Sequence, residues 1–222
     1  MTTARAHRHH EPRKRELRTA KTASAEQAIG QVTPGMEVFI LTHGQFDLID
    51  ALVYLVNQVG PVDVVVVTWT FAHASLLRAV ELIEHGAVRR FRMVVDHNML
   101  RRPNAAALVE QVAALFGADH VRTVKSHAKF AVISNDKWHL AIRTSMNLNQ
   151  NPRLESLEIS DDLALCGFLL GIVDSLWREQ DANAPLDMFP RFNDDPAPAF
   201  VGPVRVGRAT AKHLYPKPRS QP

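Results

Sequence analysis

The stretch EVFILTHGQFDLIDALVYLVNQVGPVDVVVVTWT (residues 37–70) sets two apolar runs on either side of a helical repeat. The runs 37–42 and 62–70 are short and mostly apolar, which is typical of buried strands. Residues 46–60 repeat apolar side chains at helical spacing and end at Gly60, so they predict a helix. This order of strand, helix and strand is the unit from which sheets with parallel strands are built.

The alternation of strand and helix continues beyond residue 70. We predict helices over 73–86, 104–117 and 161–180, and strands over 91–96 and 120–125. Two further strands, 127–134 and 138–145, are separated only by Asn135-Asp136-Lys137, which is typical of a hairpin turn. We therefore predict an α/β fold with a central mixed, mostly parallel sheet that is covered by helices.

Length and composition predict one globular domain with two tails. The chain has 222 residues, of which 46% are hydrophobic, enough to bury a substantial core. Residues 1–25 lack apolar periodicity and predict a flexible basic N-terminal arm that turns helical near its end. Residues 26–180 form the predicted domain, and residues 181–222 form a proline-rich, basic C-terminal tail.

The charges are divided unevenly along the chain. Residues 1–21 carry seven lysines and arginines against two acids, and residues 199–222 carry five against none. The stretch 22–198 carries 14 basic and 21 acidic residues, so its net charge is negative. Basic arms attract polyanions by counterion release, which makes nucleic acid the first partner to consider, with DNA ahead of RNA. The alternative is a pair of solvated, disordered ends.

Two further features of the composition bear on the cellular setting. Cys166 is the single cysteine, so the chain forms no internal disulfide, and we expect a buried, inert thiol in a reducing compartment. No apolar run reaches the roughly 18 residues of a membrane span, so we expect a cytoplasmic protein without a membrane partner. Histidines at positions 7, 9 and 10 lack a partner cluster, and we predict no metal site.

Polar residues of unusual kinds gather in the segment from Ser126 to Ser160. His127 and Lys129 are two residues apart on a predicted strand, so they point to the same face. A three-residue turn would pair position 127 with Ser145 and set Lys129 opposite Arg143. Two cations that face each other indicate a bound anion such as a phosphate. The alternative is an ordinary hydrogen-bonded histidine and a surface lysine.

The order His127-x-Lys129, then Ser145-x-Asn147, then Glu158-Ile159 resembles the HKD signature of the phospholipase D superfamily. The resemblance implies a sandwich-like α/β fold and an enzyme that cleaves or exchanges phosphodiesters. It also implies that His127, Lys129 and Asn147 matter most, with Ser145 and Glu158 next. Glu155 competes with Glu158, and we favour Glu158 because Ile159 follows it and its distance from Asn147 suits the family better.

The motif departs from the family pattern at two positions. The family usually has an aspartate five residues after the lysine, where this chain has Ser134, and a glycine where it has Thr144. The hairpin is also three residues longer than in the family, and Asp136 is a candidate substitute for the missing aspartate. The aspartate is generally a supporting residue in the family, so its loss weakens the match without removing the chemistry.

The residue types suit phosphodiester cleavage without a metal or another cofactor. Lys129 and Asn147 can stabilise the charge on the phosphate oxygens, and a neutral imidazole can attack phosphorus to give a phosphohistidine. A glutamate can orient the histidine ring by accepting its other N–H. A second imidazolium must protonate the leaving oxygen, yet the chain has one HxK match. The resemblance therefore implies a homodimer that shares one site.

Further candidates follow the predicted strands, where ligands usually bind in α/β sheets. We expect substrate contacts from Arg143, Trp69, His43 and Gln45, with Trp69 able to stack on a base. Other polar residues at these ends are Thr42, Thr68, Thr70, Asp96, His97 and Asn98. The alternative is that such residues are helix caps and that Trp69 belongs to the core.

Three functions compete. The leading hypothesis is a metal-independent phosphodiesterase, most simply a nuclease. A second is a phospholipid hydrolase or transferase, although the chain shows no membrane anchor. A third is a nucleic-acid-binding protein whose HKD site has decayed. The departures from the family pattern at Ser134 and Thr144 favour this hypothesis.

Overall fold

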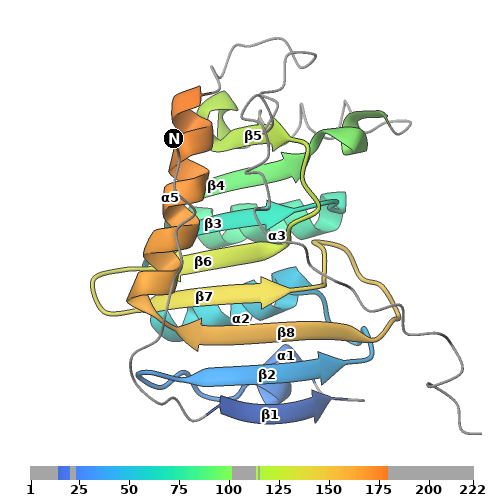
Figure 1. The fold of residues 1–222 in the computed structure, drawn as a ribbon, viewed down its shortest axis with the longest axis vertical. Coiled ribbons are helices and arrows are strands. Elements are labelled where there is room, and N and C mark those ends of the chain that lie inside the picture. Colours follow the sequence, from blue (N-terminus) through green and yellow to red (C-terminus); the bar gives the residue numbers. More distant parts are fainter. Residues whose placement is uncertain (1–14, 21–23, 102–113, 115, 180–222) are drawn as a thin grey trace, which may run out of the picture. The chain divides into compact units, whose positions relative to one another are not determined.

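The computed structural model describes residues 15–20, 24–101, 114 and 116–179. They form one eight-stranded sheet in the order β1-β2-β8-β7-β6-β3-β4-β5 (Figure 1). The strands are β1 (Arg15–Ala20), β2 (Glu37–Thr42), β3 (Val62–Thr68), β4 (Val88–Asp96), β5 (Val121–Val124), β6 (Phe130–Ser134), β7 (His139–Thr144) and β8 (Glu155–Asp161). The helices are α1 (Ala25–Ile29), α2 (Leu48–Val59), α3 (His73–Glu84) and α5 (Leu163–Glu179), with short 3-10 turns at His97–Arg101 and Ala118–His120.

The sheet is mixed and its strands mostly run in one direction, which confirms the predicted α/β class. Strand β2 is parallel to β1, and β3 and β4 are parallel to each other, as are β4 and β5. The pairings β2–β8, β8–β7, β7–β6 and β6–β3 are antiparallel. Strands β6 and β8 therefore run against the other six.

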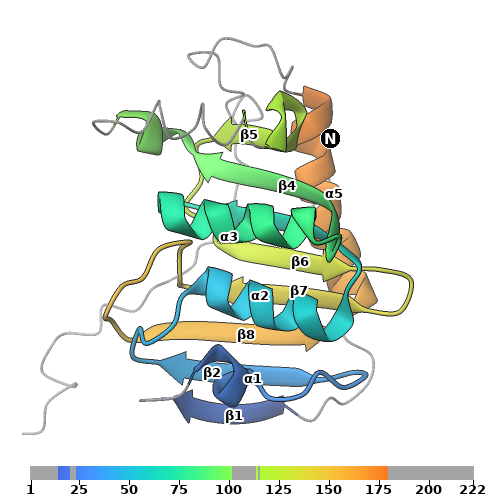
Figure 2. The same cartoon turned by 180° about the vertical axis from the view of Figure 1, so that it is seen from behind.

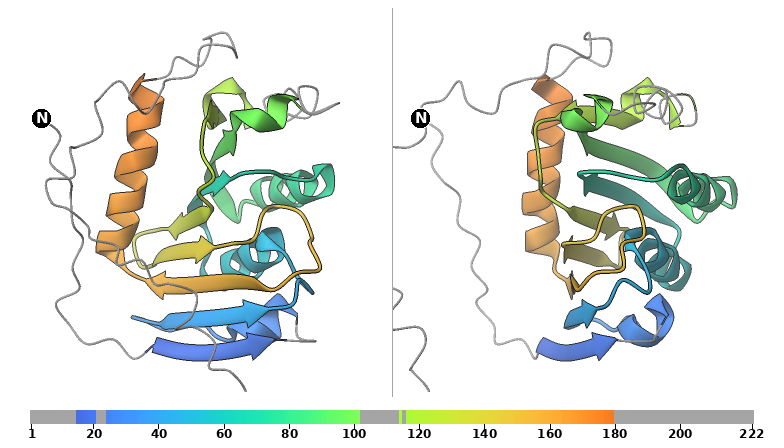
Figure 3. Two further views of the ribbon diagram at one scale, coloured as in Figure 1. Left: turned by 45° about the vertical axis from the view of Figure 1, so that its right-hand side comes forward. Right: turned by 90° about the vertical axis from the view of Figure 1, so that its right-hand side faces the viewer.

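Helices cover the two faces of the sheet unequally. Helices α1, α2 and α3 lie on one face (Figure 2), and α5 lies on the other (Figure 3). Burial on both faces of the sheet explains the valine run in β3. Val64 and Val66 belong to the core under α1–α3, and Val65 and Val67 belong to the core under α5. A strand buried on both faces has no polar alternation.

Most predicted elements are present with small shifts at their ends. Strand 37–42 coincides with β2, and helix 46–60 becomes α2, which begins after a capping box formed by Asp47 and Asp50. The predicted helix 104–117 lies almost wholly outside the described residues.

Strands β1 and β8 were not predicted from the sequence. We predicted a flexible arm over residues 1–25, but residues 15–20 within it form strand β1. Pairing with β2 stabilises this polar strand, and Arg15 forms an ion pair with Glu37. Such contacts join residues far apart in the sequence, so no local pattern reveals them. The rest of the predicted arm through residue 14, and the tail from residue 181, lie outside the described residues.

Candidate active site

One edge of the sheet collects the motif residues. The carboxyl ends of β2, β3, β4 and β7 meet there with the amino ends of the reversed strands β6 and β8. His127 and Lys129 precede β6, Ser145 and Asn147 follow β7, and Glu155 begins β8. The two reversed strands thus bring residues from distant parts of the motif segment to the edge where α/β proteins usually bind ligands.

His127 lies between a cation and an aromatic ring. The Lys129 ammonium Nζ is 3.3 Å from His127 Nδ1 and 3.2 Å from the His127 carbonyl oxygen. The Trp69 ring centroid is 5.2 Å from the imidazole centroid, and the two ring planes are tilted by 48°. Desolvation lowers the pKa of Lys129, while the negative charge of Glu155 acts in the opposite direction. His127 itself is exposed, so a substrate can reach it.

Ser145 and Glu155 form a pair across the junction of β7 and β8. The Ser145 hydroxyl donates to Glu155 Oε2, and the Ser156 N–H donates to Ser145 Oγ at 2.9 Å. Because Glu155 also acts on the pKa of Lys129, its carboxylate belongs to the same polar group as the motif lysine. The geometry therefore favours Glu155 as the acid of the site.

The geometry does not favour Glu158, the acid preferred from the sequence. Glu158 pairs with Arg143 on β7 and with Arg15 on β1, at 3.1 Å from the latter. It lies three residues from Glu155 on one strand, and an odd separation sends side chains to opposite faces. Arg143 and Glu158 consequently lie on the α5 face, away from Lys129. Glu158 therefore lies on the opposite face from Glu155, paired with Arg143, and its role in the site stays a prediction.

The hairpin register differs from the predicted one by one residue. Phe130, rather than Lys129, pairs with Arg143, and Ser134 pairs with His139. The turn contains one more residue than predicted, because the Asn135 side-chain oxygen accepts from the N–H groups of both Lys137 and Trp138. A shift of one residue moves every side chain to the other face, so Lys129 and Arg143 do not face each other, and the bound anion predicted from that pair loses its basis.

Asn147 is held in place by its neighbours on both sides. Its side chain is 7% exposed, and its Oδ1 accepts from the Thr68 hydroxyl at 3.5 Å. The next residue, Leu148, donates to the Thr70 carbonyl at 3.3 Å and accepts from the Ala72 N–H at 2.8 Å. The end of β3 therefore fixes the backbone that carries Asn147.

The turn after β2 meets the loop that joins β7 to β8. Gly44 has φ +77°, and a Cβ atom there would lie 1.9 Å from the Asn151 carbonyl oxygen. Only glycine fits such a contact. In this turn Gln45 Oε1 accepts from the His43 N–H at 2.7 Å, so the Gln45 side chain shapes the turn. Both residues lie at the motif edge, and their role in substrate binding stays a prediction.

Asp96 anchors the segment that precedes His127. Its side chain is 2% exposed, and its two carboxylate oxygens accept from the N–H groups of Asn98 and Ser126, each at 2.8 Å. The Ser126 hydroxyl in turn accepts from the Ala128 N–H at 3.1 Å. Asp96 therefore joins the end of β4 to the backbone on both sides of His127. Its position as the last residue of an apolar strand was its signal in the sequence.

The structure also explains the two departures from the family pattern. Strand β6 carries both Ser134 and Asp136 to the edge of the sheet opposite His127, so Asp136 lies at the same edge as the position where the family has its aspartate. Thr144 has a structural role, because its hydroxyl donates to the Ser156 carbonyl at 2.7 Å and accepts from the Met146 N–H at 2.9 Å. The threonine thus ties β7 to β8 directly beside Ser145.

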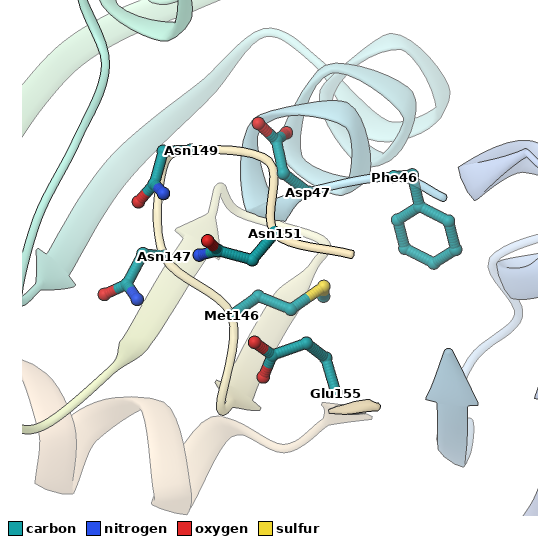
Figure 4. A pocket seen from close by; sticks show the side chains of 7 residues that line it. All are labelled: Phe46, Asp47, Met146, Asn147, Asn149, Asn151 and Glu155. Carbon is teal, nitrogen blue, oxygen red and sulfur yellow. The ribbon is translucent and has the colours of Figure 1, made fainter. Parts of the chain in front are cut away.

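A narrow crevice that has no room for a water molecule adjoins the site (Figure 4). It lies between the start of α2 and the loop after β7, and it is lined by Phe46, Asp47, Met146, Asn147, Asn149, Asn151 and Glu155. Burial, together with the charge of Asp50, raises the pKa of Asp47 to about 6. The same carboxylate caps α2 by accepting from the Asp50 N–H at 3.1 Å.

Other sequence predictions concern metal, membrane and the thiol. The residues that the structure describes contain no group of three or more His, Cys, Asp or Glu side chains placed to hold a metal ion. Among the described helices, none has the length and apolar character needed to cross a bilayer. Cys166 is buried, and burial raises the pKa of its thiol to about 12. This thiol is therefore protonated and poorly reactive.

The sequence matches no protein-family model, and a search of curated proteins also finds no match. Solved structures with a similar fold include a polyphosphate kinase from Porphyromonas gingivalis, with a TM-score of 0.47 and 14% identity over 67% of this chain. NucT from Helicobacter pylori has a TM-score of 0.41 and 14% identity over 64% of this chain and 94% of its own. TrmBL2, an archaeal chromatin protein that binds DNA, has a TM-score of 0.35 and 9% identity over 64% of this chain and 52% of its own.

The present chain spans 27% of the length of the polyphosphate kinase. These likenesses concern the fold alone.

Proposed function

We propose that this chain is a phosphodiesterase of the phospholipase D type that acts on nucleic acid without a metal. The observation that supports it is the contact of Lys129 with His127, at the sheet edge that also carries the Ser145–Glu155 pair and Asn147. These groups provide a nucleophile, a cation and hydrogen-bond donors, which are the elements that cleavage of a phosphodiester requires.

The contact between Lys129 and His127 suggests how the nucleophile becomes active. An ammonium donates, so His127 Nδ1 presents a lone pair to Lys129 and the ring proton of a neutral imidazole then lies on Nε2. Attack through Nε2 requires that Lys129 turn to the phosphate oxygens, after which the proton moves to Nδ1. A bound phosphodiester, which attracts the ammonium, would therefore convert His127 to its reactive tautomer.

The proposed reaction has two steps and needs a second imidazole. His127 Nε2 forms a bond to phosphorus while the bond from phosphorus to the leaving oxygen breaks, and an imidazolium donates its proton to that oxygen. Water then attacks the phosphohistidine, gives its proton to the same second imidazole, and releases His127. We assign this second group to His127 of the partner subunit, so the active species is a homodimer with one shared site.

The first experiment is cleavage of labelled single- and double-stranded DNA in excess EDTA. We expect products with the wild-type chain and with His85→Ala, which alters an exposed histidine just after α3. His127→Ala should give none, and rapid denaturation at alkaline pH, where a phosphohistidine is stable, should trap substrate phosphate on the wild-type and His85→Ala proteins but not on His127→Ala. A His127→Ala chain that still cleaves would overturn the assignment of the nucleophile.

Other outcomes select the remaining hypotheses. Binding of DNA without turnover, unchanged by His127→Ala, would identify a binding protein with a decayed site. Release of headgroups from phospholipid vesicles, without any cleavage of DNA, would identify a lipid hydrolase. A catalytically active monomer in light scattering would contradict the shared site.

A further inference from the structure

Most cations of the described domain are paired with acids. Among the lysine and arginine side chains that the structure describes, eight form ion pairs with aspartate or glutamate: Arg15, Arg18, Arg78, Arg89, Arg90, Arg92, Arg122 and Arg143. Five others have no ion pair within the described residues: Lys125, Lys129, Lys137, Arg153 and Arg178. Because the stretch 22–198 carries 21 acids against 14 basic residues, it attracts a polyanion most strongly where unpaired cations gather.

Three of these five cations lie at the edge of the sheet that carries the motif. Lys125 directly follows β5, which is parallel to β4 and therefore ends at that edge. Lys129 precedes β6, and Arg153 lies in the loop that joins β7 to β8. The β5–β6 and β7–β8 connections, which carry all three, run along this edge (Figure 1). The cations that the described acids leave unpaired are thus concentrated around the candidate site.

The three cations occupy different positions along the edge. In the sheet order β8-β7-β6-β3-β4-β5, Arg153 lies at β8, Lys129 at β6 and Lys125 at β5. Neighbouring strands are about 4.8 Å apart, so these strand ends span about 24 Å. Lys129 and His127 lie between Lys125 and Arg153, which we call the outer cations. One strand of B-DNA advances about 3.4 Å per nucleotide, so a span of this length carries several phosphates.

The fold holds the backbone beside each outer cation. Lys125 lies directly before Ser126, whose N–H donates to the buried Asp96 carboxylate at 2.8 Å. The Arg153 N–H donates to the Asn151 carbonyl at 2.8 Å. Both cationic side chains are exposed, so a ligand can reach them. A charge on an ordered backbone loses less conformational freedom when it binds a partner.

We propose that Lys125 and Arg153 bind phosphates on either side of the reacting phosphate, and that the substrate is a nucleic-acid strand lying along this edge from β8 to β5. This inference rests on the proposed function, in which His127 and Lys129 act on the central phosphate. A nucleic acid carries a phosphate at every nucleotide, whereas a phospholipid such as phosphatidylcholine carries one. The outer cations therefore favour a polymeric substrate through charge, without reading a base.

The alternative is that the outer cations are ordinary solvated surface charges. Two octanucleotides of one sequence separate this alternative from the proposal. In the first, which we call the native strand, every linkage is a phosphodiester. In the second, the neutral strand, only the central linkage is a phosphodiester and all others are uncharged methylphosphonates. The bond to be cut is the same in both strands, so they differ only in the flanking charges, and a gel reports cleavage at the central linkage.

At low salt the wild-type chain should cut the native strand at least about 25-fold faster than the neutral strand, because each of two ion pairs contributes about 5-fold. Lys125→Gln and Arg153→Gln should each lower this ratio about 5-fold by slowing only cleavage of the native strand. Lys137→Gln and Arg178→Gln are the controls, since each removes one positive charge from an exposed cation in the β6–β7 turn or near the end of α5. Equal slowing of both strands by the outer-cation variants, or a loss no larger than in the controls, would overturn the proposal.

Binding distinguishes failure of this inference from failure of the proposed function. The binding constant K of the native strand is measured between about 50 and 200 mM salt. Lys125→Gln and Arg153→Gln should each lower the slope of log K against log salt by about 0.7, the value for one phosphate of a single strand, and the controls should leave the slope unchanged. If no chain cleaves DNA but these slopes fall, the phosphodiesterase assignment fails and the role of the outer cations stands. If the wild type cleaves DNA and the outer-cation variants bind and cut like the controls, the outer cations have no such role and the proposed function stands.

Discussion

The contact at Gly44 permits a sharp test of how the site is held together. Gly44→Ala adds a methyl group at φ +77°, where a Cβ atom would lie 1.9 Å from the Asn151 carbonyl oxygen and 2.8 Å from the Arg153 nitrogen. Ordinary close C···O contacts are about 3.3 Å, so the turn and the loop must separate by about 1.4 Å. The positive φ alone costs about 1–2 kcal/mol, and the overlap should add about 1–3 kcal/mol.

The displaced loop begins at Asn147 and ends at Glu155, so we expect an effect on catalysis as well. A misplacement of about 1 Å near reacting groups can reduce the rate about 100-fold. Cleavage of a single-stranded oligonucleotide in EDTA measures this loss, and urea unfolding measures the loss of stability.

Gly86→Ala is the matched control for this substitution. Gly86 has φ +72°, close to that of Gly44, but nothing lies within 4 Å of the added Cβ atom. It should therefore show the cost of the backbone conformation alone, with unchanged cleavage. If Gly44→Ala and Gly86→Ala are equally stable and equally active, the contact of Gly44 with Asn151 has no energetic consequence.

Three further predictions concern acids and charges. In parallel steady-state assays, Glu155→Gln should reduce the cleavage rate at least about 10-fold, while Glu158→Gln should leave the rate within about 2-fold of wild type. A larger loss in Glu158→Gln than in Glu155→Gln would instead support Glu158, the acid preferred from the sequence. The pKa of Asp47 is raised to about 6, so the folded state favours its protonated form and the wild type loses stability as pH rises from about 4 through 6. Asp47→Asn keeps the helix cap, so it should be more stable than wild type by about 1–3 kcal/mol at pH 7 and equal to wild type at pH 4. Urea unfolding across this pH range measures the difference in stability. An Asp47→Asn variant that is less stable than wild type at pH 7 would contradict the raised pKa of Asp47. Deletion of residues 1–14 removes four lysines and arginines and leaves β1 intact, so it should weaken DNA binding and lower the slope of log K against log salt by up to about 4; an unchanged slope would exclude the arm from binding.

The strands and helices of the domain were largely predictable because their signals are local. The apolar run 37–42 became β2 with the same bounds, and the capping residues Asp47 and Asp50 mark the start of α2 in the sequence itself. Strand β8 carries a weaker signal, the alternation of Leu157 and Ile159, which a short motif-rich segment hides. Strand β1 carries almost none, since its stability comes from β2 and from the ion pair of Arg15 with Glu37.

The candidate site was predictable in its residue types and only in part in its geometry. The spacing His127-x-Lys129 and Ser145-x-Asn147 identified the segment, and the reversed strands bring both pairs to one edge. The choice between two glutamates depended on which face each occupies. That depends on the register of β8 against β7, in which Glu158 pairs with Arg143, and residue spacing does not reveal this register.

The sequence by itself determined the class of fold and the residue types of the motif, because periodicity and residue type act over a few neighbouring positions. The tertiary structure alone decided that Glu155 rather than Glu158 joins Ser145, that Asp96 anchors the backbone around His127, and that Trp69 stands beside its ring. These contacts join separate strands and loops. A shift of one residue in pairing sends a side chain to the other face of the sheet, so they are set by packing and not by local pattern.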